Sequence, residues 1–196
     1  MTQASELRQK VNAAYSDAAI HPQGRHPFPV GRAFAEGVGY PAEGLARMAS
    51  SSVEAFTGVS NVSLFAEIPL SATVLDLGCG AGLDSLIASH RTGPAGRVVG
   101  MDFSSSMLAR ARQAQQESGA ERVWFCQADA EKVPLPDGSV DVALVNGIFN
   151  LNPGRTAIFR ELGRVVAPGG TVYAAELILR EPLPPDQRQR EDNWFA

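Results

Sequence analysis

The hydrophobic pattern divides the chain into a helical start, an irregular segment and a long alternating region. In residues 1–19, apolar side chains recur at three- and four-residue spacing, which predicts an amphipathic helix. Residues 21–40 are rich in proline and glycine. Because proline fixes φ and lacks an N–H donor, we expect a shaped loop there rather than a regular helix or central strand. Short helices are expected to start at Pro41 and to cover 51–56.

From residue 73 onward, short apolar runs alternate with segments of helical spacing, which is typical of repeated strand–helix–strand units. The segments expected to form strands are 73–78, 97–102, 123–129, 140–147 and 171–179, and those expected to form helices are 82–90, 105–117 and 153–165. Nearly continuous apolar strands indicate that helices cover both faces of the sheet. The pattern predicts an α/β fold, a Rossmann-like, doubly wound, mainly parallel sheet of about five strands in the order 3-2-1-4-5.

Helix boundaries and chain length refine this picture. Ser104 and Asn152 stand where N-caps are expected, with Pro153 at the first helical position. At 196 residues the chain is long enough for one domain with a full core and too short for two comfortable ones. We divide it into an N-terminal helix and Pro/Gly-rich cap, a ligand-binding core and a C-terminal tail: 1–71, 72–180 and 181–196.

Composition and charge narrow the classes of partner. A formal net charge of -4 provides no electrostatic footprint for nucleic acid or an anionic membrane, so a small molecule is the expected partner. The first twenty residues are polar rather than signal-like, and no apolar run approaches a membrane span. The two cysteines suggest neither a disulfide framework nor a metal site. We therefore expect a cytoplasmic protein without a metal.

A glycine-rich turn, GCGAG at residues 78–82, lies between the first predicted strand and the following helix. Glycines allow the backbone to approach a ligand closely, and the helix N-terminus supplies unpaired N–H donors. A dinucleotide-binding fingerprint requires a small residue at the position of Leu83, so pyrophosphate binding is the less favoured interpretation. Tight strand-to-helix turns also need glycine for steric reasons, so the turn alone does not identify a ligand.

Three acidic residues lie at or near the ends of the predicted strands. Asp102 ends the second strand, where such folds place an acid that accepts from both ribose hydroxyls. Asp129 follows the third strand and is a candidate acceptor for an adenine amino group, or alternatively a turn or helix-capping residue. Asp76, inside the first strand, contacts the ligand or rigidifies the glycine turn, and the two roles are compatible.

With VLDLGCGAG, GMD, QADAE, DVALVN and VVAPGGTV in order, residues 72–180 resemble class I S-adenosylmethionine (SAM)-dependent methyltransferases. The resemblance implies that Asp102 holds the ribose, Met107 packs beside the cofactor and 128–131 line the adenine. It also implies that the first helix, with Tyr15, folds over the methionine end, and that Asn146 begins the substrate-side loop. SAM is then the methyl donor and S-adenosylhomocysteine (SAH) the product. The predicted cofactor-binding residues are Asp76, Gly78, Cys79, Gly80, Gly82, Asp102, Phe103, Met107, Ala128, Asp129, Ala130 and Asn146.

Within that class, the segments around 82–112 and 146–184 are similar to the arsenite methyltransferase branch. That branch captures thiophilic arsenic with cysteines, because soft thiolates suit a soft centre. The resemblance places one such cysteine where this chain reads Gly58-Val59-Ser60-Asn61, and another at Gly147 in Asn146-Gly147. A third would lie past the C-terminus. The thiols are absent here, so we expect a small-molecule acceptor other than arsenite.

The sequence does not single out a catalytic group. The candidates are Tyr15, His26, Tyr40 and Asn146, and a histidine between prolines is also a common hydrogen-bonded loop residue. Aromatic faces such as Tyr15 and Phe149 favour a sulfonium charge by about 0.5–2 kcal/mol. A thiolate or enolate acceptor needs no general base, whereas a phenol or amine does.

The fold expected from the resemblance has two further strands, six and seven, that this chain lacks. The fifth strand is then an apolar edge, so either the sequence is truncated or a second copy of the chain covers that edge. The competing functions are a catalytically silent SAM-binding subunit or truncated methyltransferase, and an NAD(P)-binding oxidoreductase. The second is disfavoured by Leu83 and by the acids at positions 76 and 129.

Overall fold

The computed structural model describes residues 3–181, with side chains from Ser5 onward. Its sheet contains β1 (Thr73–Leu77), β2 (Arg97–Asp102), β3 (Val123–Gln127), β4 (Val140–Asn146) and β5 (Val166–Ala175). The strand order is β3-β2-β1-β4-β5, and each neighbouring pair is parallel. The predicted α/β fold and its strand order are therefore confirmed.

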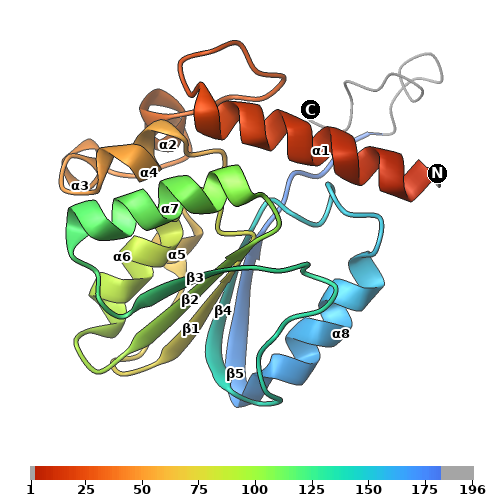
Figure 1. Ribbon diagram of the computed structural model, residues 1–196. Coiled ribbons are helices and arrows are strands. Elements are labelled where there is room, and N and C mark those ends of the chain that lie inside the picture. Colours follow the sequence, from red (N-terminus) through yellow and green to blue (C-terminus); the bar gives the residue numbers. More distant parts are fainter. Residues whose placement is uncertain (1–2, 182–196) are drawn as a thin grey trace.

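Two apolar cores flank the sheet, because alternate side chains of each strand face opposite sides. On one side α6 (Leu83–Thr92) and α7 (Ser105–Ser118) pack against β1 residues such as Val74. On the other side α8 (Arg155–Val165) packs against Leu75 and Leu77. Figure 1 shows α8 on the opposite side of the strands from α6. The prediction of helices on both faces is thus confirmed.

The cap that precedes β1 is mainly helical. It consists of α1 (Gln3–Ile20), α2 (Arg32–Gly37), α3 (Ala42–Leu45), α4 (Ser50–Glu54) and α5 (Val62–Phe65). Figure 1 shows α1 lying across α7. Two contacts attach it there, a 3.0 Å hydrogen bond between the hydroxyls of Ser16 and Ser104 and a 2.7 Å bond from Nε of Arg110 to the Ala19 carbonyl. Helix α1 therefore covers the end of the sheet at which α7 begins.

The largest differences from the sequence prediction lie at α2, α8 and β5. Residues 21–40 include the helix α2, because no proline interrupts the chain between Pro29 and Pro41. Helix α8 begins at Arg155 rather than at Pro153, and the Asn152 side chain accepts from the Gly154 N–H at 2.7 Å instead of capping the helix.

Strand β5 begins at Val166, five residues before the predicted start at position 171, and ends at Ala175, four residues before the predicted end at position 179. The segment that includes Pro168 and Gly169, which precedes the predicted strand, forms an irregular stretch of β5. Val166 pairs with Val140, and after a register shift Thr171 pairs with Val142. An edge strand accommodates proline because its missing N–H faces no partner strand.

The N-cap predicted at Ser104 is confirmed, since its hydroxyl accepts from the Met107 N–H at 3.3 Å.

Within residues 3–181, the outer edge of β5 has no partner strand, and Leu177, Ile178 and Leu179 beyond it are exposed. Most of the predicted tail, residues 182–196, lies outside the described residues. In the described part of the chain, each helix is too short or too polar to cross a bilayer.

Candidate functional site

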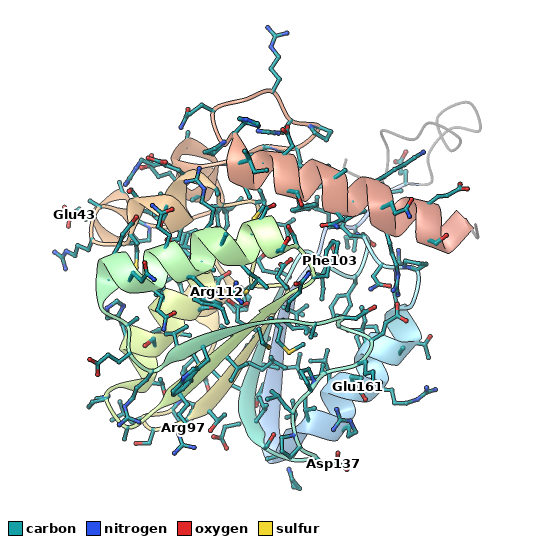
Figure 2. All side chains as sticks on the ribbon, viewed as in Figure 1. Glu43, Arg97, Phe103, Arg112, Asp137 and Glu161 are labelled. Atoms are coloured by element: carbon teal, nitrogen blue, oxygen red, sulfur yellow. The ribbon has the colours of Figure 1, made fainter. Side chains whose placement is uncertain are left out.

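A cavity lies at the carboxyl ends of β1, β2, β3 and β4, where open α/β sheets bind ligands. Its empty space, counted together with the open mouth, is about 1130 Å³. Helix α1 contributes Arg8, Val11 and Tyr15 to its wall. Phe103, labelled in Figure 2, follows β2 beneath α1 and is 41% exposed. The cavity therefore lies between the sheet and the N-terminal helix.

The glycine turn forms the floor of this cavity. Gly78, Gly80 and Gly82 all have positive φ angles, of 78°, 51° and 85°. The N–H groups of Gly78 and Cys79 donate to the Met101 carbonyl at 2.8 and 2.9 Å, which ties the turn to the end of β2. A Cβ on Gly78 would overlap a methyl group of Ile148, whereas a Cβ on Gly80 would face open space except for Met107.

Asp102 is buried beside the turn. One carboxylate oxygen accepts from the Gly80 N–H at 2.9 Å, and the other accepts from the Ser104 N–H at 2.8 Å. Burial raises the pKa of Asp102 from 3.8 to about 6, although these backbone hydrogen bonds partly oppose the shift. A carboxylate oxygen has more than one acceptor site, so Asp102 can still accept from a ligand that donates hydroxyl protons.

Two further carboxyl groups lie at the inner end of the cavity. Asp76 is fully buried and accepts from the Ser85 hydroxyl at 2.5 Å, and burial followed by the charge of Asp84 raises its pKa. Asp84 accepts from the Tyr40 hydroxyl and from the Ser63 N–H. Asp84 was not predicted from the sequence, although an acid between Leu83 and Leu86 in the buried first turn of α6 is a signal that could have identified it.

Asn146, at the end of β4, forms hydrogen bonds through both the oxygen and the nitrogen of its side-chain amide. Its oxygen accepts from the N–H groups of Val59 and Ser60 at 2.9 and 3.1 Å. Its nitrogen donates to the Ser60 carbonyl at 2.7 Å and to Asp84 at 2.8 Å. Asn146 therefore connects the cap, the core sheet and the first turn of α6.

Asp129, the acid after β3, forms an ion pair with helix α1. Its carboxylate lies 2.7 Å from the Arg8 guanidinium, and its other oxygen accepts from the Glu131 N–H at 3.0 Å. Arg8 also pairs with the Glu131 carboxylate. Sequence reasoning missed Arg8, because nothing local marks which of the positive charges on α1 meets a partner more than a hundred residues away.

Most of the predicted site residues line one cavity. Those that line it are Tyr15, Asp76, Gly78, Cys79, Gly80, Asp102, Phe103, Ala128, Asp129, Ala130 and Asn146. Met107 is buried behind the turn, next to Ala81, and Gly82 is the N-cap of α6. Neither of these two is part of the cavity lining.

The catalytic candidates separate into two groups. Tyr15 and Asn146 line the cavity, whereas His26 and Tyr40 are not among its lining residues. The imidazole of His26 hydrogen-bonds to the His21 carbonyl at 2.9 Å, as expected for a hydrogen-bonded loop residue. Tyr15 stacks on the ring of Phe28 at 4.5 Å, and burial raises the pKa of its phenol. Tyr15 is thus a neutral aromatic wall of the cavity at ordinary pH.

Comparisons with known proteins agree with this geometry. A family model described as "Methyltransferase domain" matches residues 71–195. Arsenite methyltransferase of Halobacterium salinarum is 34% identical over 158 residues, 81% of this chain and 40% of that protein. Demethylmenaquinone methyltransferase of Lactococcus lactis is 32% identical over 123 residues, 63% of this chain and 48% of that protein. The chain thus spans less than half the length of these two curated relatives.

Solved structures give the same result. The arsenic (III) S-adenosylmethionine methyltransferase from Chlamydomonas reinhardtii superposes with a TM-score of 0.62 at 26% identity, covering 82% of this chain and 53% of that one. A SAM-dependent methyltransferase from Aquifex aeolicus superposes with a TM-score of 0.54 at 26% identity, covering 61% and 65%.

Proposed function

Because the chain belongs to the methyltransferase-domain family, in the class of SAM-dependent Rossmann-like enzymes, we propose that it transfers a methyl group from SAM to a small-molecule acceptor. The observation that carries the proposal is the hydrogen bond from the Gly80 N–H to the buried Asp102 carboxylate. This hydrogen bond joins two features inside one cavity: a turn whose backbone can approach a ligand closely, and an acid suited to accept from ribose hydroxyls.

The residues of the cavity fit SAM in chemical character. We expect Asp102 to accept from the ribose hydroxyls, and Asp129 to accept from the adenine amino group while Ala128 and Ala130 contact the ring. Asp102 is 8% exposed, and no ion pair to it occurs in the described part of the chain, so a ligand that donates hydroxyl protons would complete its hydrogen bonding. Tyr15 is expected to cover the methionine end.

When bound, SAM supplies an already activated methyl group on a positively charged sulfur. The work left to the chain is to align the acceptor and to exclude water, and alignment of two bound reactants contributes on the order of 7–11 kcal/mol. Helix α1 supports both tasks, because its residues Val11 and Tyr15 form the wall of the cavity that lies opposite the sheet. The aromatic ring of Tyr15 also favours a neighbouring cation.

For the acceptor, we propose a small organic molecule rather than arsenite. Val59 and Gly147 stand where the arsenic branch is expected to carry cysteines, and they lie against each other: a Cβ on Gly147 would be 2.9 Å from a methyl group of Val59. Gly147, Ile148 and Leu151 line the cavity, whereas Val59 lies behind Gly147 and is not among the lining residues. The thiol in the cavity lining, Cys79, belongs to the glycine turn, and the absence of thiols at positions 59 and 147 favours an acceptor with an apolar body over a soft metalloid.

Calorimetry followed by a turnover assay tests the proposal. We expect SAM and SAH to bind and NADH not to bind. SAH is then expected to accumulate with at least one member of an acceptor panel that includes demethylmenaquinol and other small phenols. Binding of SAH without turnover on any acceptor would favour a silent SAM-binding subunit. Binding of NADH but not of SAH would overturn the proposal in favour of an oxidoreductase.

A further inference from the structure

We propose that Asn146 and Asp84 are positioning residues that hold residues 57–60 in place as the acceptor-side wall of the cavity. The inference rests on the proposed function, because it assigns a role in methyl transfer to residues that bind neither methyl donor nor acceptor directly. It also gives Asn146 a different role from the cofactor contact expected from the sequence.

The side chain of Asn146 has no hydrogen-bonding capacity left for a ligand. An amide oxygen accepts two hydrogen bonds and an amide nitrogen donates two. The oxygen of Asn146 accepts from Val59 and Ser60, and its nitrogen donates to the Ser60 carbonyl and to Asp84. Although Asn146 lines the cavity, all four hydrogen bonds hold protein groups.

These bonds secure a segment that has few other attachments. Among the described residues, the main-chain polar groups of Val59 and Ser60 are bonded only to Asn146, apart from a 3.3 Å contact between the Ser60 carbonyl and the Tyr40 hydroxyl, whose single proton is shared with Asp84. Thr57 and Gly58, in the same segment, line the cavity. The position of this wall therefore depends on one asparagine that lies 86 positions along the chain from Ser60.

Asp84 anchors the asparagine. It is 6% exposed, and its second oxygen accepts from Asn146 while its first accepts from the Tyr40 hydroxyl and from the Ser63 N–H at 3.2 Å. A buried carboxylate with three donors is fixed in orientation, because each lost hydrogen bond would leave a buried charge poorly solvated. Asp84 thus fixes the cap and the end of β4 relative to each other.

The close approach of the two segments depends on glycine at Gly58. A Cβ there would lie 2.5 Å from the Asn146 nitrogen, so any larger residue displaces the amide. Gly37 in α2 offers a matched control, because a Cβ on Gly37 meets nothing within 4 Å and its φ is not positive. The cofactor contacts expected at Gly80 and Asp102 lie outside this network.

Amide hydrogen exchange, measured by NMR on the full chain with saturating SAH, tests the proposal. In Asn146→Ala and Gly58→Ala we expect the protection factors of the Val59 and Ser60 amides to fall at least tenfold. Protection of β1 amides and the dissociation constant of SAH are expected to stay within threefold. Gly37→Ala is expected to retain protection at Val59 and Ser60.

Asn146→Asp adds a second test, the pH dependence of amide protection at Val59 and Ser60. The new carboxylate would face Asp84 and the Ser60 carbonyl, so protection should be low at pH 8 and should recover at acidic pH as the group takes up a proton. Where the acceptor panel gives turnover, Asn146→Ala is expected to raise the acceptor KM more than it lowers kcat.

Unchanged protection at Val59 and Ser60 in both Asn146→Ala and Gly58→Ala would overturn the proposal. So would a loss of SAH affinity above tenfold in Asn146→Ala, because that result would make Asn146 a donor-binding residue. The exchange measurement requires no acceptor and no turnover. A failure of methyl transfer therefore remains distinguishable from a failure of this inference.

Discussion

The guanidinium of Arg8 lies 2.7 Å from the carboxylate of Asp129, and thereby joins the first helix to the loop after β3 across 121 positions of the chain. Asp129 is the acid expected to meet the adenine amino group, and both residues line the cavity. Closure of the cavity by α1 and the electrostatic environment of that acid are therefore coupled.

The first prediction concerns this ion pair. The Arg8 and Asp129 side chains are 40% and 44% exposed, so Arg8→Gln should change the free energy of unfolding by no more than about 1 kcal/mol. The contact nevertheless holds α1 over the cavity, and SAH should dissociate about threefold to tenfold faster. A chase experiment with labelled SAH measures the rate.

Arg32→Gln is the control for Arg8→Gln, since Arg32 forms a similarly exposed pair with Glu36 on the cap, and neither residue lines the cavity. Its SAH dissociation rate should match that of the unmodified chain. Equal dissociation rates in Arg8→Gln and the unmodified chain would mean that the ion pair does not retain the ligand.

The second prediction follows from the raised pKa of Asp102, about 6. Since this pKa lies above its unfolded value, the protonated form favours folding, and the contribution of Asp102 to stability increases as pH falls through about 6. Ligand binding has the opposite dependence, because ribose hydroxyls donate to the carboxylate. SAH affinity should fall by about tenfold between pH 7 and pH 5.

Calorimetry across this pH range measures the effect, and Asp102→Asn serves as its control. The asparagine still offers an oxygen acceptor but does not titrate, so the variant should bind SAH more weakly at pH 7 and show a flatter pH profile. An unchanged slope in Asp102→Asn would assign the titration to another group, such as Asp76, whose pKa is also raised by burial.

The third prediction separates two reasons for glycine at Gly78. Alanine there is strained by the positive φ, by about 1–2 kcal/mol, and its Cβ also overlaps Ile148. Gly119 has a similar φ of 63°, but a Cβ there meets nothing within 4 Å. Gly78→Ala should therefore lower the free energy of unfolding by about 1–3 kcal/mol more than Gly119→Ala.

Urea denaturation measures both free energies. Adding Ile148→Ala to Gly78→Ala should change the free energy of unfolding by less than Ile148→Ala does in the unmodified chain, because the overlap is relieved. If Gly78→Ala and Gly119→Ala lost the same stability, backbone strain alone would account for the glycine.

The fourth prediction concerns arsenite. Because Val59 and Gly147 replace the expected thiols, incubation with SAM, arsenite and a thiol reductant should yield no methylated arsenic and no arsenite-dependent SAH. Liquid chromatography with elemental detection of arsenic measures the methylated arsenic, and chromatography with ultraviolet detection measures SAH. Arsenite-dependent SAH at a rate comparable to that with an organic acceptor would show that the remaining residues are sufficient for arsenic capture.

Local patterns were sufficient for the parallel sheet and for much of the candidate cofactor site. The glycine turn and Asp102 are recognisable in the sequence because each follows a strand at a fixed separation, and parallel strands bring their carboxyl ends together. The sequence prediction was wrong at the start of β5, because pairing with β4 extends this strand back to Val166 through an irregular stretch that contains Pro168 and Gly169.

The sequence by itself determined the strands of the sheet, their order and the glycine turn after β1, since periodicity and turn chemistry act over a few residues. Only the tertiary structure decided the partners of Arg8, Asp84 and Asn146, which lie 121, 62 and 86 or 87 positions from the groups they contact. A side chain's hydrogen-bond partner depends on how distant segments pack, and no local pattern encodes it. For that reason the glycine turn and Asp102 were predictable from the sequence, whereas the hydrogen bonds that hold residues 57–60 were not.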